Sequence, residues 1–260
     1  MSRIDDAFKY KPIFMPYFPL GYPDLATSMD VIEALAKNGA DLIEVGLSFS
    51  DPLADGPVVQ KATQIALEKG ITIKRSLKAI AELRSRGVDI PLVLMGYYNP
   101  LLAYGLEKLV DDARSADVDG FIIPDLPPEE DDEFVSAIDG SHLPLIRMLA
   151  PTTPPARMEL VARGAQGFIY LVSVTGVTGA RQSLANGLTE LVTRVREHTS
   201  VPVCVGFGIG TPEQAKAVGA VADGVIVGSA CVRSIGESKN PVEAARELAI
   251  SFQAVLRNHQ

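Results

Sequence analysis

Short apolar segments recur along the whole chain, and most are rich in β-branched residues. Their near-continuous apolar character is typical of parallel strands buried on both faces, rather than of antiparallel strands with one face in water. We predict eight strands, at residues 13–18, 41–46, 91–97, 120–124, 143–149, 167–174, 201–207 and 223–229.

Amphipathic segments with helical spacing lie between these strands. DLATSMDVIEALAKNGA predicts a helix with Asp24 as its N-cap and an end at Asn38-Gly39. SLKAIAELRSRG ends in the same way at Gly87, and TPEQAKAVGA opens with Thr211 as cap. This alternation predicts an α/β protein, a (β/α)8 barrel (TIM barrel) with extra short helices. A doubly wound open sheet is the alternative, but the first loop, PLGYPD, lacks its glycine fingerprint.

Composition narrows the classes of partner. The chain has 260 residues without a linker or composition shift, which predicts one domain over residues 1–260. A formal net charge of -8 argues against nucleic acid or an anionic membrane as the main partner. No apolar run approaches the ~18 residues that span a bilayer, and MSRIDDAFKY lacks the apolar core of a signal peptide. We therefore expect a cytoplasmic protein.

The cysteines and histidines of the sequence indicate neither a disulfide framework nor a metal site. Cys204 and Cys231 are too few for a disulfide framework and are predicted as buried apolar residues. The three histidines are scattered without metal-ligand spacing, so no metal site is expected.

Carboxylates cluster around the second predicted strand. In DLIEVG the alternation places Leu42, Glu44 and Gly46 on one face, so Glu44 lies in a buried strand. Such a glutamate is either satisfied by a polar neighbour or held at an altered pKa. Asp55 lies eleven residues later, in the loop leaving the C-terminal end of that strand, so both carboxylates could face one cavity. Asp51, in the same loop, is expected to be a turn residue.

Glycine-containing segments follow the last three predicted strands: SVTGVTGARQS, GFGIGTPEQ and VGSA. Barrels often bind phosphate with the loops after strands 7 and 8 and the N-terminus of a short helix. Gly208 and Gly228 permit close backbone approach, and Ser229 adds a hydroxyl at a helix start. These loops predict a phosphorylated ligand. The long loop at residues 173–186 is either a surface loop or a lid that closes over the site.

Taken together, LIEVGLSFSDPLADGPVVQ, YLVSVTGVTGAR, VGFGI and VIVGSA resemble the α subunit of tryptophan synthase, in order and approximate spacing. The resemblance covers nearly all of the chain, and FSDPLADGP is highly specific. It implies a retro-aldol cleavage of indole-3-glycerol phosphate to indole and glyceraldehyde 3-phosphate, without a cofactor. It also implies a pyridoxal-phosphate-dependent β subunit as partner, in an αββα assembly that passes indole through a tunnel.

The resemblance also implies roles for individual residues. Glu44 matches the general acid/base, and Asp55 matches the carboxylate that binds the indole N–H and stabilises the positive ring. The residues that match the substrate-binding positions are Tyr17, Phe207, Tyr170 and Thr178, and those that match the phosphate cradle are Gly179, Gly208, Gly228 and Ser229.

Three positions depart from the family pattern. Ser48 stands where members often carry proline, Pro19 where they carry threonine, and Tyr17 where some have phenylalanine. These changes affect the shape of the partner-facing turn and of the indole pocket, and leave the carboxylates and phosphate loops intact.

Three other functions stay open: a stand-alone lyase that releases free indole, a catalytically silent barrel that activates a β subunit, and a sugar-phosphate isomerase barrel. The isomerase leaves FSDPLADGP unexplained, and the intact carboxylates speak against the silent barrel.

Overall fold

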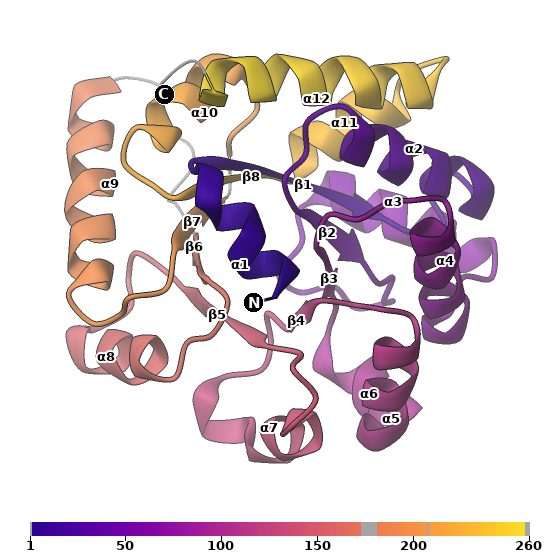
Figure 1. Ribbon diagram of the computed structural model, residues 1–260, viewed down its shortest axis with the longest axis horizontal. Helices are drawn as coiled ribbons and strands as arrows, with labels where there is room; N and C mark the ends of the chain where they lie inside the picture. Colours follow the sequence, from indigo (N-terminus) through magenta and orange to yellow (C-terminus); the bar gives the residue numbers. More distant parts are fainter. Residues whose placement is uncertain (1, 173–180, 207, 258–260) are drawn as a thin grey trace.

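Eight parallel strands form a closed barrel in sequence order, with the eighth paired to the first (Figure 1). The computed structural model describes residues 2–172, 181–206 and 208–257, and for 181–186 the backbone alone. The closed barrel of parallel strands in sequence order confirms the predicted (β/α)8 barrel. The strands are β1 (Ile13–Pro19), β2 (Ile43–Gly46), β3 (Leu92–Met95), β4 (Gly120–Ile122), β5 (Leu145–Leu149), β6 (Ile169–Val172), β7 (Val203–Gly206) and β8 (Gly224–Val227).

Helices surround the barrel, and several short ones are additional to the strand–helix alternation, as predicted (Figure 1). The α-helices are α1 (Arg3–Ala7), α2 (Leu25–Lys37), α3 (Pro57–Glu68), α4 (Ile73–Ser85), α5 (Tyr98–Tyr104), α6 (Leu106–Ser115), α7 (Asp132–Ile138), α8 (Pro155–Arg163), α9 (Arg181–Arg196), α10 (Pro212–Gly219), α11 (Ser229–Gly236) and α12 (Pro241–Arg257). The 3-10 helices are η1 (Phe8–Tyr10) and η2 (Pro128–Glu130).

Side-chain caps fix where these helices begin. Asp24 accepts a hydrogen bond from the Thr27 amide at 2.9 Å, and Thr211 caps α10 as predicted. The helix predicted from residue 76 starts earlier, at Ile73, because the Thr72 hydroxyl accepts from the Arg75 amide at 3.2 Å.

Alternation along the strands divides the core into a barrel interior and an outer layer under the helices. Leu42, just before β2, belongs to the interior cluster, whereas Ile43 and Val45 on β2 pack outward, as the sequence pattern predicts. Helix α1 lies across the N-terminal opening of the barrel (Figure 1), and Ile4 and Phe8 join the interior cluster from there. The barrel is therefore closed at that end and open for chemistry only at the other.

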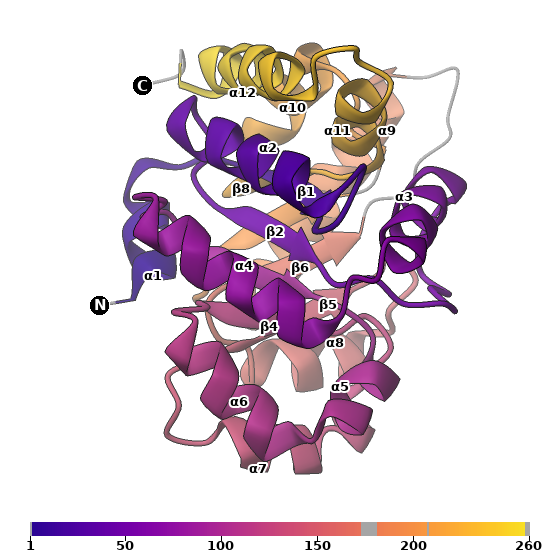
Figure 2. The same cartoon turned by 90° about the vertical axis from the view of Figure 1, so that its right-hand side faces the viewer.

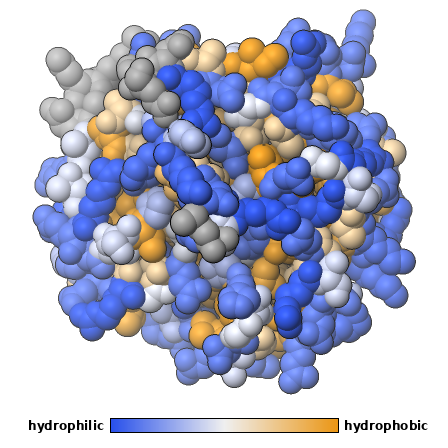
Figure 3. Space-filling view, viewed as in Figure 1, coloured by the Kyte–Doolittle hydropathy of each residue, from blue (hydrophilic) through white to orange (hydrophobic). Residues whose placement is uncertain are grey.

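Three aspartates lie one or two residues before strands at the closed end of the barrel. Asp41, Asp119 and Asp223 each accept a backbone N–H from a neighbouring strand at 2.8–2.9 Å, and each is ion-paired. The face of the molecule at this end is mainly hydrophilic (Figure 3). We refer to these three residues as the lower aspartates.

The opposite end of the barrel carries the loop that leads into α3 (Figure 2). Both cysteines are buried, as predicted. Within the described residues, no helix is long and apolar enough to cross a membrane. The single-domain organisation of residues 1–260 stays a prediction.

Candidate active site

A cavity of about 240 Å³ lies at the C-terminal end of the barrel strands. It brings together residues from β1, β2, β3, β6 and α3, from the loops after β2, β7 and β8, and from the start of α11. The residues that line it are Tyr17, Glu44, Asp55, Val59, Met95, Tyr170, Gly208, Ile209, Gly210, Gly228, Ser229, Ala230 and Arg233.

Glu44 is held by the second strand in the middle of the sheet. It lies level with Tyr17 on β1 and Val93 on β3, and only 1% of its surface is exposed. Its Oε1 atom is buried and has no hydrogen-bond partner among the described residues. Burial in this apolar setting raises the pKa of Glu44 well above its ordinary value. The carboxyl is therefore protonated over a wider pH range than in water, as a general acid requires.

Asp55 faces the same cavity from a loop rather than from a strand. Its backbone N–H donates to the Pro52 carbonyl at 3.0 Å, and its own carbonyl accepts from the Gln60 side chain at 2.8 Å. Burial raises the pKa of the Asp55 carboxyl, and a hydrogen bond from the Tyr97 hydroxyl counteracts part of that rise. The two carboxylates thus share a cavity but differ in environment, a common way to divide acid and anion roles.

Two buried tyrosines complete the apolar walls of the cavity. Burial raises the pKa of both Tyr17 and Tyr170, and the nearby carboxylates add to the effect, so both hydroxyls are neutral donors. Each ring leans over a glycine at the end of the next strand: a Cβ on Gly46 would lie 2.3 Å from the Tyr17 hydroxyl, and one on Gly206 2.5 Å from that of Tyr170. The glycines therefore make room for the rings.

The far side of the cavity is lined by glycine backbone and a helix start. Gly208 has a φ of 75°, a left-handed conformation that favours glycine, and a Cβ on Gly228 would meet nothing within 4 Å. Ser229 is the first residue of α11, so N–H groups without intrahelical partners lie at this edge. Arg233, one turn further along α11, supplies the cationic side chain among the described lining residues. This side of the cavity suits an anion.

The structure brings together seven of the residues singled out from sequence. Glu44, Asp55, Tyr17, Tyr170, Gly208, Gly228 and Ser229 all line the cavity. Thr178, Gly179 and Phe207 lie outside the described residues. Asp51 is exposed and is not among the lining residues, which agrees with a turn position.

Sequence reasoning missed Val59, Met95, Arg233 and the cavity's neighbour Tyr97. Met95 ends the third strand and Tyr97 follows two residues later, so their position at strand C-termini was the available signal. For Arg233 the signal was a basic residue four positions after Ser229, on the same helix face.

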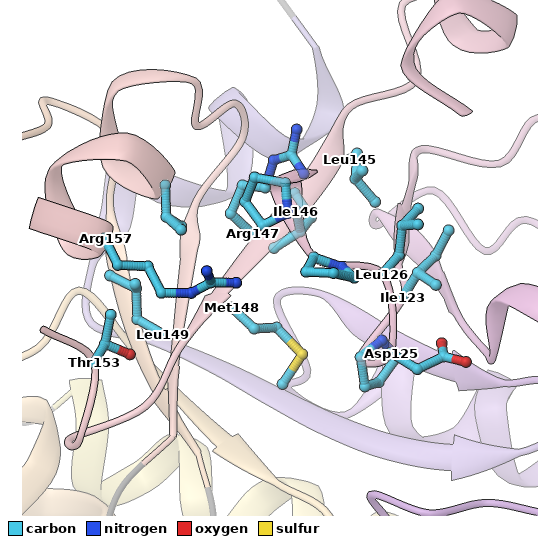
Figure 4. Close-up of a pocket in the computed structure, with 14 residues that line it drawn as sticks. Ile123, Asp125, Leu126, Leu145, Ile146, Arg147, Met148, Leu149, Thr153 and Arg157 are labelled. Atoms are coloured by element: carbon cyan, nitrogen blue, oxygen red, sulfur yellow. The ribbon is translucent and has the colours of Figure 1, made fainter. Parts of the chain in front are cut away.

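A second cavity, of about 350 Å³, lies between β4, β5 and α8 (Figure 4). Arg147 and Arg157 lie along it, but Arg147 pairs with Asp131 and Arg157 with Glu129. The described residues that line this cavity do not include two carboxylates without ion-pair partners. The α-helix that begins beside it is α8, which starts with proline. The cavity at the barrel mouth is the better candidate active site.

A closed (β/α)8 barrel with two carboxylates opposite a glycine-lined helix start defines a class: barrel enzymes that perform acid–base chemistry on anionic small molecules. The sequence profile of the tryptophan synthase alpha chain family matches residues 5–259. The chain belongs to that family.

Individual relatives support the same assignment. The chain is 50% identical over 237 residues to the tryptophan synthase alpha chain of Chloroflexus aurantiacus, covering 89% of each sequence. The crystal structure of tryptophan synthase subunit alpha from Legionella pneumophila superposes with a TM-score of 0.92 at 34% identity, covering 99% of both chains. A chain in a crystal structure of tryptophan synthase from M. tuberculosis gives 0.88 at 34% identity, again covering 99% of both.

Proposed function

We propose that Glu44 and Asp55 together carry out the reaction of this family in the cavity at the barrel mouth. The chain is a lyase that cleaves indole-3-glycerol phosphate in tryptophan biosynthesis. The carbon–carbon bond that breaks joins C3 of the indole ring to the first glycerol carbon. The products are indole and glyceraldehyde 3-phosphate, and no electrons are exchanged with a redox partner.

Glu44 is assigned the proton transfers. Its protonated carboxyl gives a proton to C3 of the indole ring, which leaves positive charge on the ring nitrogen. The resulting carboxylate takes the proton from the hydroxyl on the first glycerol carbon, and that carbon becomes the aldehyde as the bond to C3 breaks. The bonding electrons return to the ring, which becomes indole. The observation that carries this role is the buried Oε1 atom of Glu44, which has no hydrogen-bond partner among the residues that the structure describes.

Asp55 is assigned the stabilisation of the positive charge on the indole ring. An anionic carboxylate that accepts a hydrogen bond from the indole N–H stabilises the cation that forms when C3 is protonated. The hydrogen bond from Tyr97 supports this role, because it counteracts the rise in the pKa of Asp55 that burial causes. Tyr17 and Tyr170 are proposed to contact the indole, together with Phe207.

The phosphate is proposed to bind at the start of α11. Backbone N–H groups at Gly208, Gly228 and Ser229, the Ser229 hydroxyl and the dipole of α11 supply attraction for a dianion. Arg233 adds a positive charge on the same side of the cavity. Gly179 and Thr178 are proposed to complete the cradle and the lid.

The family is one whose members act together with a β subunit. We propose an αββα assembly in which the loop between β2 and α3 contacts that partner. Leu53 in this loop is 90% exposed, and an apolar side chain so far out in water suits a protein contact. The same loop carries Asp55, so partner binding and substrate binding meet in one short segment.

The test is indole release from indole-3-glycerol phosphate, measured with and without the β subunit. We expect Asp55→Asn to lower kcat by a factor of about 10²–10³. Ser229→Ala is expected to raise KM about tenfold with little change in kcat, since it removes one neutral hydrogen bond to phosphate. If Asp55→Asn retains full activity, the site assignment is wrong. Strong activity of the isolated chain would instead favour the stand-alone lyase.

A further inference from the structure

Tyr97 joins two loops at the barrel mouth that are far apart in sequence. It follows β3 and is the N-cap residue of α5, and only 4% of its surface is exposed. Its ring packs against Phe49 from the loop after β2, with ring centroids 5.6 Å apart. The ring therefore has a fixed place beside the segment that carries Asp55.

The Tyr97 hydroxyl interacts with the loop between β2 and α3. It accepts a hydrogen bond from the Ala54 backbone N–H at 3.0 Å, and its own O–H is the neighbour that lowers the pKa of the Asp55 carboxyl. A phenol has one proton and two lone pairs, so it can do both at once. In the part of the chain that the structure describes, Tyr97 is the side chain that lowers the pKa of Asp55.

Apart from the Gln60 side chain, which donates to the Asp55 carbonyl at 2.8 Å, the loop gives Asp55 little other support. Residues 53 and 54 are exposed, and the hydrogen bonds within the loop, from the Leu53 amide to the Asp51 carbonyl and from the Asp55 amide to the Pro52 carbonyl, are between backbone groups of the same turn. They shape the turn without tying it to the barrel. The hydrogen bond from the Ala54 amide to the Tyr97 hydroxyl supplies that tie, at the residue before Asp55.

We propose that Tyr97 is a positioning residue that holds the Asp55 carboxylate in place and keeps it anionic for the charged ring. This inference rests on the proposed role of Asp55. It adds a function for a residue that does not line the cavity, and it predicts that Tyr97 acts on the reaction only through Asp55.

The electrostatic consequence follows from the groups around Asp55. Burial raises the pKa of this carboxyl, and the hydrogen bond from Tyr97 lowers it. The other titratable or charged groups that face the cavity come from β1, β2, β6 and α11, and they are Tyr17, Glu44, Tyr170 and Arg233. None of them is a hydrogen-bond partner of Asp55 among the described residues, so loss of the Tyr97 hydroxyl leaves the effect of burial on the pKa of Asp55 unopposed. The pKa of Asp55 then rises, and a smaller fraction is anionic at a given pH.

The first experiment compares Tyr97→Phe with wild type in indole release across pH, in the complex with the β subunit. We expect kcat at neutral pH to fall about tenfold, KM to change less than threefold, and the acid limb of the kcat profile to move to higher pH. Tyr98→Phe is the matched control, because its hydroxyl lies 3.5 Å from Glu133, at an exposed position. That variant should keep the wild-type profile.

The second experiment places Tyr97→Phe in an Asp55→Asn background. If Tyr97 acts through Asp55, the added substitution lowers the remaining activity less than twofold, whereas independent effects multiply. An equal loss in both backgrounds, or an unmoved acid limb in Tyr97→Phe, overturns the proposal.

A third measurement does not depend on activity or on the proposed reaction. The carboxyl of Asp55 is titrated by NMR in protein labelled with ¹³C at aspartate carboxyl groups, with its signal assigned by its loss in Asp55→Asn. The pKa should be higher in Tyr97→Phe than in wild type, and equal values contradict the inference. If wild type releases no indole while this pKa rises as expected, the proposed role in catalysis fails and the contact between Tyr97 and Asp55 stands.

Discussion

The two ends of the barrel treat buried carboxylates in opposite ways. At the closed end, the lower aspartates each accept a backbone N–H and pair with a cationic side chain from another part of the chain. At the open end, neither Glu44 nor Asp55 has an ion-pair partner among the described residues, and Oε1 of Glu44 has no partner there at all. The same chemical group stabilises the fold at one end and is kept available for substrate at the other.

The ion pairs at the closed end also connect distant elements. Arg257 at the end of α12 pairs with Asp41 before β2, and Arg196 at the end of α9 lies 2.8 Å from Asp223 before β8. A cation lowers the pKa of a neighbouring carboxyl, as Arg196 and Lys11 do at Asp223, so a carboxylate paired in that way at the open end would hold a proton less readily. The difference between the ends therefore separates stability from reactivity within one small barrel.

Glu44→Gln gives the largest expected effect at the open end. The amide cannot transfer the proton, so we expect kcat for indole release to fall by about 10³. The same substitution should increase the stability of the folded protein at neutral pH. Burial raises the pKa of Glu44, so the folded state still binds a proton at pH values above about 4.3, where the unfolded chain has released it. The stability of the wild-type protein therefore falls as the pH rises from about 4.3 towards the folded pKa of Glu44. The neutral amide removes this dependence.

Urea unfolding of wild type and Glu44→Gln at several pH values measures this. The variant should gain on wild type as the pH rises above the ordinary pKa of a glutamate, about 4.3, and the two should converge near pH 4. A variant that is less stable at every pH would show that Glu44 is a satisfied structural residue, and the comparison between the two ends would fail.

Asp223→Asn gives an intermediate effect, on stability rather than on activity. Burial alone would raise the pKa of Asp223, but hydrogen bonds from Arg196 and Lys11 outweigh it and leave the pKa below its ordinary value. The contribution of this carboxylate is thus present above about pH 3.9 and is lost as the pH falls through its folded pKa. Both cations are half exposed, so we expect a loss of about 2 kcal/mol at neutral pH.

The measurement is urea unfolding at pH 7 together with indole release by the folded variant. Activity per folded molecule should stay within about twofold of wild type, because Asp223 lies at the opposite end of the barrel from the cavity. A large fall in kcat with unchanged stability would contradict the division of roles between the two ends.

Ser48→Ala gives the smallest expected effect. The Ser48 Oγ atom is buried and has no hydrogen-bond partner among the described residues, so its removal should stabilise the protein by about 1 kcal/mol. Ser28→Ala is the matched control, because the buried Ser28 hydroxyl donates to the Leu25 carbonyl and accepts from the Gly21 amide. Thermal unfolding should show a gain for the first variant and a loss for the second. Losses of equal size would mean that Ser48 is bonded.

The barrel could be predicted from the sequence because its signals are local. Apolar segments mark the strands, and a single cap such as Asp24 marks a helix start. The ion pairs of the lower aspartates could not be predicted in this way, because Asp41 and Arg257 are 216 residues apart. At the site, Glu44 and Asp55 stood out as polar residues in or after an apolar strand. Tyr97 did not, because its partner at residue 54 is 43 residues away and only the closed barrel brings them together.

The two glycines beneath the tyrosines restrict how this barrel can evolve. At Gly46 a Cβ would also lie 2.6 Å from the ring carbon that bears the Tyr17 hydroxyl, so replacing tyrosine with phenylalanine does not relieve the clash. Gly206 is constrained in the same way by Tyr170, whose ring carbons come within 2.8 Å. A lineage that acquires a larger residue at either strand end must first lose the aromatic side chain above it. The order of the two substitutions is therefore fixed, and the intermediate has an enlarged pocket.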